Sequence, residues 1–122
     1  MKKKILIIED DNFLQGLEAS KLKKAGYEVS AASNGEEGMA KINEEGVCLI
    51  LLDIILPQFD GFEILKKVRE DKTMKDLPII VFSNLSEDKD IKKANDLGAN
   101  DFMVKSNFTL DELVERIEKI LK

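Results

Sequence analysis

Five short apolar runs recur along the chain, and each is followed by a longer segment whose apolar residues have helical spacing. Three of the runs are almost continuously apolar, which is typical of parallel strands whose two faces are both covered by helices. This alternation predicts an α/β domain in which right-handed crossovers join five parallel strands through five helices. The runs lie at residues 5–8, 27–32, 47–52, 79–82 and 102–104.

Capping signals mark where the expected helices begin and end. Thr109 and Glu112 have the spacing of a capping box, and a stripe of apolar residues follows them. Ser86 is expected to cap the preceding helix. The first helix is expected to end near Gly26 and to bury one face, which carries Leu14, Leu17, Leu22 and Ala25.

A chain of 122 residues is long enough for one domain with a substantial core. We therefore expect a single domain over residues 1–122. Five alternating units of this length fit the flavodoxin-like, doubly wound sheet with the strand order 2-1-3-4-5. In that order the winding reverses between the first and third strands, and a crevice opens beyond their carboxyl ends.

The stretch LILLDIILPQFDG, residues 49–61, carries a carboxylate, Asp53, directly after a run that is typical of a buried strand. An unpaired charge inside the sheet would be unfavourable by several kcal/mol. The strand order resolves this conflict, because it puts Asp53 at the mouth of the crevice. Polar residues also lie at this end of the first, fourth and fifth strands: Glu9 and Asp10, Ser83, and Lys105.

The carboxylates expected at this edge repel one another unless a cation lies between them. Lys105 supplies one positive charge, and a divalent ion would supply the remainder. The chain contains no histidine, which excludes Ser-His-Asp and Cys-His catalysis. Oxygen ligands alone favour Mg²⁺ or Mn²⁺ over zinc. Such a pocket suits phosphoryl chemistry in which a carboxylate is the nucleophile.

The charge balance bears on possible partners. With 19 basic and 24 acidic residues, the net charge is −5. Nucleic-acid binding requires a basic face, so direct contact with DNA or RNA is not expected. The apolar part of the opening MKKKILII is too short for a signal peptide, and no run is long enough to span a membrane. We expect a cytoplasmic protein without membrane association.

Four motifs together resemble the receiver domain of bacterial two-component response regulators over the whole chain: ILIIEDD, LLDIILPQFDG, PIIVFSN and GANDFMVKS. The resemblance implies that Asp53 accepts a phosphoryl group. It also implies that Asp10, Asp53 and the backbone carbonyl of Ile55 bind Mg²⁺, while Glu9 orders a coordinated water.

The same resemblance implies that Ser83 bonds to the phosphoryl group, that Lys105 pairs with it, and that Phe102 is the aromatic residue of the switch. Two positions depart from the family pattern. Asn84 follows the switch hydroxyl, where the family usually has a small residue, and Ser106 follows the lysine in place of proline. A cis bond before a residue other than proline costs roughly 3 kcal/mol, so we expect the peptide before Ser106 to be trans.

The function that the resemblance implies is a phosphorylation-activated signalling switch. Its phosphoryl group would come from a histidine kinase or a histidine phosphotransfer protein. The domain would catalyse only its own phosphorylation and slow dephosphorylation, and it would act through an unknown downstream protein. The ending KILK, without a linker, favours a stand-alone receiver. An excised receiver or a designed one would have the same pattern.

Two alternatives of other classes fit the sequence less well. A Mg²⁺-dependent phosphohydrolase with an aspartyl nucleophile usually has a second aspartate two residues later, where this chain has Ile55. A flavin-binding protein of the same fold needs a phosphate loop rich in serine, threonine and glycine after the first strand. This chain instead has three acidic residues there, which would repel phosphate without a metal.

Overall fold

The structure is a computed structural model that describes residues 3–58 and 60–122. Its parallel sheet has the predicted order β2-β1-β3-β4-β5. The strands are β1 (Lys4–Ile8), β2 (Glu28–Ala32), β3 (Val47–Leu52), β4 (Ile79–Ser83) and β5 (Asp101–Val104). The helices are α1 (Asn12–Lys24), α2 (Gly35–Lys41), α3 (Gly61–Glu70), α4 (Asp88–Asp96) and α5 (Leu110–Leu121), with a 3-10 turn, η1, at Lys105–Asn107.

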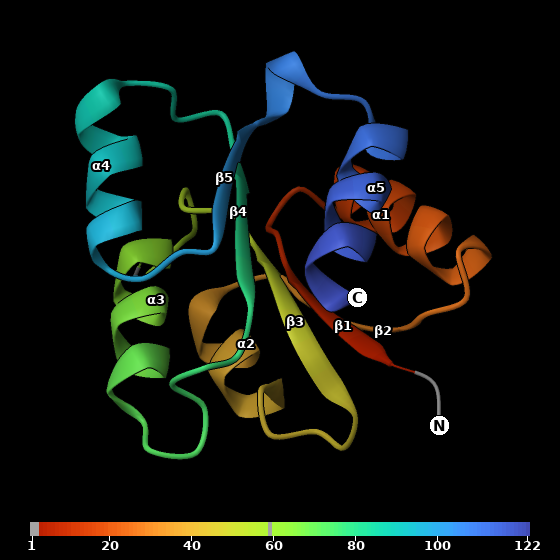
Figure 1. The fold of residues 1–122 in the computed structure, drawn as a ribbon, viewed down its shortest axis with the longest axis horizontal. Helices are drawn as coiled ribbons and strands as arrows, with labels where there is room; N and C mark the ends of the chain where they lie inside the picture. Colours follow the sequence, from red (N-terminus) through yellow and green to blue (C-terminus); the bar gives the residue numbers. More distant parts are fainter. Residues whose placement is uncertain (1–2, 59) are drawn as a thin grey trace.

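The helices cover both faces of the sheet. In Figure 1, α1 and α5 lie on one side, and α2, α3 and α4 lie on the other. Side chains along β1 alternate between the two layers: Ile5 and Ile7 belong to the core under α1 and α5, and Leu6 and Ile8 belong to the opposite core. All four are fully buried. Burial on both faces explains why the inner strands are almost continuously apolar.

The buried face of α1 differs from the expected one. Leu22 is buried, but Ala25 is exposed and the side chain of Leu17 is 42% exposed, so the expectation for these two residues is wrong. The fully buried positions of α1 are instead Glu18 and Leu22, one turn apart. The error has a simple cause: a pattern of apolar residues does not reveal an inward position that is occupied by glutamate.

The start of α4 also differs from the expectation. The N-cap is Glu87, whose side chain makes no capping hydrogen bond, so Ser86 does not cap this helix. Two aspartates in the first turn, Asp88 and Asp90, favour the positive end of the helix dipole. These two carboxylates, and not a side-chain cap, therefore stabilise the start of α4.

The helix α5 begins as predicted. The Thr109 hydroxyl accepts a hydrogen bond from the Glu112 N–H at 3.1 Å, and the Glu112 carboxylate accepts one from the Thr109 N–H at 2.9 Å. This reciprocal capping box fixes the first turn, and Leu113 and Ile117 are buried from there on. Within residues 3–58 and 60–122, no helix combines the length and apolar character needed to span a membrane.

Glu18 places an ionisable group on the inward side of α1. Its side chain is 1% exposed, and Oε1 has no hydrogen-bond partner among the described residues. Burial is the main cause that raises the pKa of Glu18 to about 8, with a further contribution from the negative charge of Glu9 and an opposing one from Lys105. The folded protein therefore keeps this carboxyl group protonated at neutral pH.

We expect Glu18→Leu to stabilise the protein increasingly as the pH rises from 5 to about 8. Below the ordinary glutamate pKa of 4.5, the folded and unfolded chains both carry the proton. Between 4.5 and about 8 only the folded chain keeps it, so the free energy of unfolding of the unmodified protein falls by up to about 1.4 kcal/mol per pH unit. Above about pH 8 both chains lose the proton, and the loss of unfolding free energy no longer grows.

Urea unfolding at several pH values measures the difference in stability between the variant and the unmodified protein. The control is Glu45→Leu at an exposed glutamate, which records the effect of the same replacement outside the core. A difference for Glu18→Leu that does not change with pH would show that Glu18 is ionised in the folded state.

Candidate functional site

Five parallel strands end at one edge of the sheet, and a polar residue lies at or just beyond the ends of β1, β3, β4 and β5. In β1 and β3, Ile8 pairs in register with Leu52, so the residues that follow them are neighbours. The Asp53 N–H continues this ladder by donating to the Ile8 carbonyl at 3.0 Å. Ser83 ends β4, and Lys105 follows β5. The topology thus brings Glu9, Asp10, Asp53 and Lys105 together, as the strand order predicts.

The centre of the site is the Lys105 ammonium group, which lies between two carboxylates. Its Nζ is 2.7 Å from Asp53 Oδ2 and 2.6 Å from Glu9 Oε1. The side chains are almost completely shielded, with exposed fractions of 12% for Lys105, 5% for Asp53 and 3% for Glu9. The two ion pairs of Lys105 connect the end of β5 to the ends of β1 and β3. The peptide between Lys105 and Ser106 is trans, as expected.

Burial and pairing act in opposite directions on these charges. Burial alone lowers the pKa of Lys105, but the carboxylates of Asp53 and Glu9 outweigh it, and the net result is a raised pKa. Lys105 therefore remains an ammonium group over the physiological range. Burial raises the pKa of Glu9, and the hydrogen bond from Lys105 offsets only part of that effect.

A third carboxylate, Asp10, completes an acidic cluster. Glu9, Asp10 and Asp53 each offer an oxygen atom, and these atoms all lie within 4.8 Å of one another. Asp10 is exposed, whereas the other two are buried, so the cluster is open to solvent on one side. A set of carboxylate oxygens without histidine or thiolate fits a hard divalent cation such as Mg²⁺.

Backbone contacts hold the Asp53 carboxylate from the loop between β3 and α3. The Ile55 N–H donates to Asp53 Oδ1 at 3.1 Å, and the Gly61 N–H donates to the Ile54 carbonyl at 2.9 Å. A Cβ atom at Gly61 would lie 2.6 Å from the Asp53 carbonyl oxygen and 2.8 Å from Ile54 Cα. Only glycine allows α3 to start this close to the backbone of Asp53.

The remaining predicted residues, Ser83 and Phe102, lie on the neighbouring strands β4 and β5. Ser83 is fully buried, and its hydroxyl accepts a hydrogen bond of 3.4 Å from the Leu85 N–H. Within the described part of the chain, this hydroxyl makes no hydrogen bond to a carboxylate. Phe102 is half-buried on β5 and packs against the core on the side of α2, α3 and α4. Ser83 thus lies at the edge, whereas Phe102 pairs in register with Val81, two residues before the end of β4.

One polar residue at this edge has no signal in the sequence. The Gln15 side-chain amide, on α1, donates to the Glu9 carbonyl at 2.8 Å and to the Ala32 carbonyl at 3.0 Å. A glutamine on a helix is usually a solvated surface residue, and the second contact spans 17 residues of sequence. Neither periodicity nor a short motif could have identified it.

Known proteins with the same fold identify the family. Residues 5–118 match the family model described as "Response regulator receiver domain". This chain belongs to that family. It is 38% identical over 122 residues to the "Alkaline phosphatase synthesis transcriptional regulatory protein PhoP" of Bacillus subtilis, a match that covers 100% of this chain and 50% of the relative. It is 34% identical to the "DNA-binding dual master transcriptional regulator RpaA" of Synechocystis, over 98% of this chain and 49% of that protein.

The solved structures agree with this assignment. The CheY-like receiver domain protein of Methanospirillum hungatei superposes with a TM-score of 0.91 at 30% identity, over 99% of this chain and 94% of that one. A response regulator structure from Chloroflexus aurantiacus gives the same TM-score of 0.91 at 32% identity, over 99% and 98% of the two chains. The chain spans about half the length of the curated relatives that it matches. Receiver domains are phosphorylation-activated signalling switches, and this chain has their complete sheet and acidic edge.

Proposed function

We propose that Asp53 is phosphorylated in a reaction that requires Mg²⁺, and that the phosphorylated domain changes a protein-binding surface. The observation that supports this most strongly is the position of Lys105, between Asp53 and Glu9 and beside Asp10. When all three carboxylates are ionised, one ammonium group leaves two negative charges at the cluster. A divalent cation at the cluster would neutralise these two charges.

The proposed reaction is a transfer of one phosphoryl group. An oxygen of the Asp53 carboxylate attacks the phosphorus, and the bond from phosphorus to the donor breaks, so that the donor leaves with the electron pair. Lys105 provides a fixed positive charge next to the new phosphoryl oxygens. Bound Mg²⁺, held by Asp10, Asp53 and the Ile55 carbonyl with Glu9 ordering a water, would neutralise the remaining oxygens. Ser83, at the end of the adjacent strand, is the proposed hydroxyl donor to the phosphoryl group.

Asp53→Asn should abolish phosphorylation, because an amide oxygen is a poor nucleophile. Intact-mass measurement after incubation with a small phosphodonor, with and without Mg²⁺, tests this. The unmodified protein should gain one phosphoryl group only when Mg²⁺ is present. Asp60→Asn, at an exposed aspartate that caps α3, is the control and should still be labelled. Labelling of Asp53→Asn at the normal rate would contradict the assignment, and multiple turnover of small phosphate esters would favour a phosphohydrolase.

We propose that the phosphorylated form is lost slowly. Hydrolysis needs a water aligned opposite the leaving carboxylate and a polar side chain that orients it. The side chains two residues beyond Asp53 and Ser83 flank the site, and here they are Ile55 and Leu85. Ile55 is 52% exposed and Leu85 is half-buried, and neither can hydrogen-bond to water.

Replacing these residues by Ile55→Asn and Leu85→Glu together should speed dephosphorylation by about 10-fold or more, since each adds a group that can orient water. The decay of phosphorylated protein after removal of the donor gives the rate. The matched control is Ile55→Val with Leu85→Met, which keeps both positions apolar and should decay like the unmodified protein. The idea fails when the polar double variant is no faster than this control.

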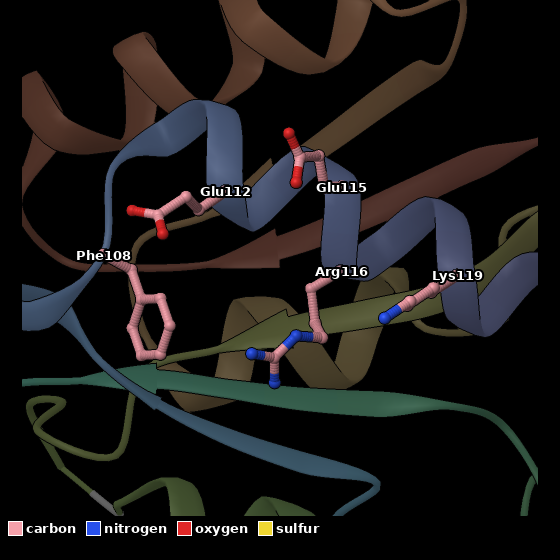
Figure 2. Close-up of a pocket in the computed structure, with 5 residues that line it drawn as sticks. All are labelled: Phe108, Glu112, Glu115, Arg116 and Lys119. Carbon is pink, nitrogen blue, oxygen red and sulfur yellow. The ribbon is translucent and has the colours of Figure 1, made fainter.

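The proposed output surface is formed by α4, β5 and α5. In β5, Phe102 lies three residues before Lys105, and Val104 pairs in register with Ser83. Movement of Ser83 toward a phosphoryl group would vacate space that Phe102 can fill by a change of rotamer. Figure 2 shows part of this surface, a groove on α5 where the Arg116 guanidinium group lies 5.5 Å from the Phe108 ring centre.

The groove is also connected to β5, because Arg116 forms an ion pair with Asp101, the first residue of that strand. A shift in β5 would therefore reach the charged side chains of α5. Histidine kinases and phosphotransfer proteins are the proposed phosphodonors, and the downstream partner is proposed to be a protein that binds this surface. The DNA-binding function in the relatives' names is not proposed for these 122 residues.

Adding beryllofluoride and Mg²⁺ should shift the backbone amide signals of Ser83, Phe102 and residues on α4 and α5, because the phosphoryl mimic draws Ser83 toward Asp53. Amide spectra of the unmodified protein before and after addition measure this. Asp53→Asn treated in the same way is the control and should not show the shifts. Shifts confined to the acidic cluster of Glu9, Asp10 and Asp53 would contradict a switch through Phe102.

A further inference from the structure

Gln15 is a polar residue at this edge to which the proposed chemistry gives no role. It is half-buried on α1, and its Nε2 lies 2.8 Å from the Glu9 carbonyl and 3.0 Å from the Ala32 carbonyl. The Ser33 hydroxyl oxygen lies 3.5 Å from the same Nε2 in a longer contact. The two carbonyl groups can only accept, so the side chain must present its NH₂ group to them. The Glu9 N–H donates to the same Ala32 carbonyl at 3.0 Å. Gln15 thus extends the pairing of β1 and β2 beyond the last residues of the strands.

The hydrogen bond from Gln15 to the Glu9 carbonyl fixes the peptide that joins Glu9 to Asp10. The Glu9 carboxylate is held separately, by Lys105 at 2.6 Å and by the Asp11 N–H at 3.1 Å. The Asp10 carboxylate accepts no hydrogen bond from the described residues and is exposed. Its direction therefore depends on the backbone that carries it, and Gln15 holds the carbonyl of the peptide immediately before it.

We propose that Gln15 is a positioning residue for the cation site, because its amide fixes the Glu9–Asp10 peptide and so directs the Asp10 carboxylate toward the cluster. This rests on the proposed cation site. Hydrogen bonds that orient metal ligands commonly change metal affinity by 10-fold to 100-fold when they are lost. The peptide after Asp10 is held as well, because the Asp11 N–H donates to Glu9 Oε2 at 3.1 Å. Gln15 holds the peptide before Asp10, so losing its contact should affect cation binding more than folding.

Gln15→Met keeps the length of the side chain and removes both donors. We expect it to weaken Mg²⁺ binding by about 10-fold. A Mg²⁺ titration followed by the backbone amide signals of Asp10 and Asp53 gives the dissociation constant. Ser20→Met, at an exposed position on the same helix, is the matched control and should bind as the unmodified protein does. Urea unfolding without Mg²⁺ records any separate loss of stability.

Each outcome of the titration has a definite meaning. Weaker Mg²⁺ binding by Gln15→Met alone supports the positioning role. Equal binding by both variants and the unmodified protein overturns it, even when Gln15→Met is less stable, and leaves the cation site intact. Failure of the unmodified protein to bind Mg²⁺ would overturn the proposed function as well.

A second measurement uses the unmodified protein and does not depend on whether the variant folds. Mg²⁺ should shift the side-chain amide signals of Gln15, since a cation beside Asp10 polarises the carbonyl that these hydrogens contact. Asn43, exposed between α2 and β3, is the internal control, and its side-chain signals should stay unchanged. Gln15 signals that do not move when Asp10 and Asp53 respond would overturn the proposal.

Discussion

The pairing of one ammonium group with two buried carboxylates is the constraint on which the site depends. Two carboxylates in so shielded a place would repel each other, and Lys105 reduces this repulsion by lying within 2.7 Å of both. Burying charges is itself unfavourable, and removing one member of such a set typically destabilises a protein by roughly 3–5 kcal/mol. The arrangement is therefore better understood as a means of holding the Asp53 carboxylate in place than as a source of stability.

Strand order makes this pairing possible with residues that are far apart in the sequence. Lys105 and Asp53 are separated by 52 positions, yet each lies one residue beyond a parallel strand. The edge also requires a close approach of the following backbone, which Gly61 permits where a Cβ would lie 2.6 Å from the Asp53 carbonyl oxygen. The same glycine begins α3, so the helix that covers one face of the sheet also supports the loop around Asp53.

Sequence patterns predicted the sheet well because every inner strand is buried on both faces and so contains little except apolar residues. The acidic edge followed from the strand order, since residues after parallel strands must meet. The patterns were misleading on α1, where Glu18 occupies an inward position and Leu17 an outward one. They also missed Gln15, whose contacts depend on the path of the chain between β1 and β2 and not on local spacing. A single polar residue that breaks the spacing of the apolar residues in a helix cannot be recognised from that spacing.

The fold offers a short physical route from Asp53 to the proposed output surface. Ser83 and Lys105 lie at the ends of β4 and β5, which pair in register along Ile80–Ser83 and Asp101–Val104. A phosphoryl group on Asp53 would recruit both residues, so it would act on the same ends of two neighbouring strands at once. The buried residues of this pair, such as Met103 and Val81, resist displacement because they are packed on all sides. Phe102 is half-buried against the core on the side of α2, α3 and α4, so it is the residue of β5 proposed to change its rotamer.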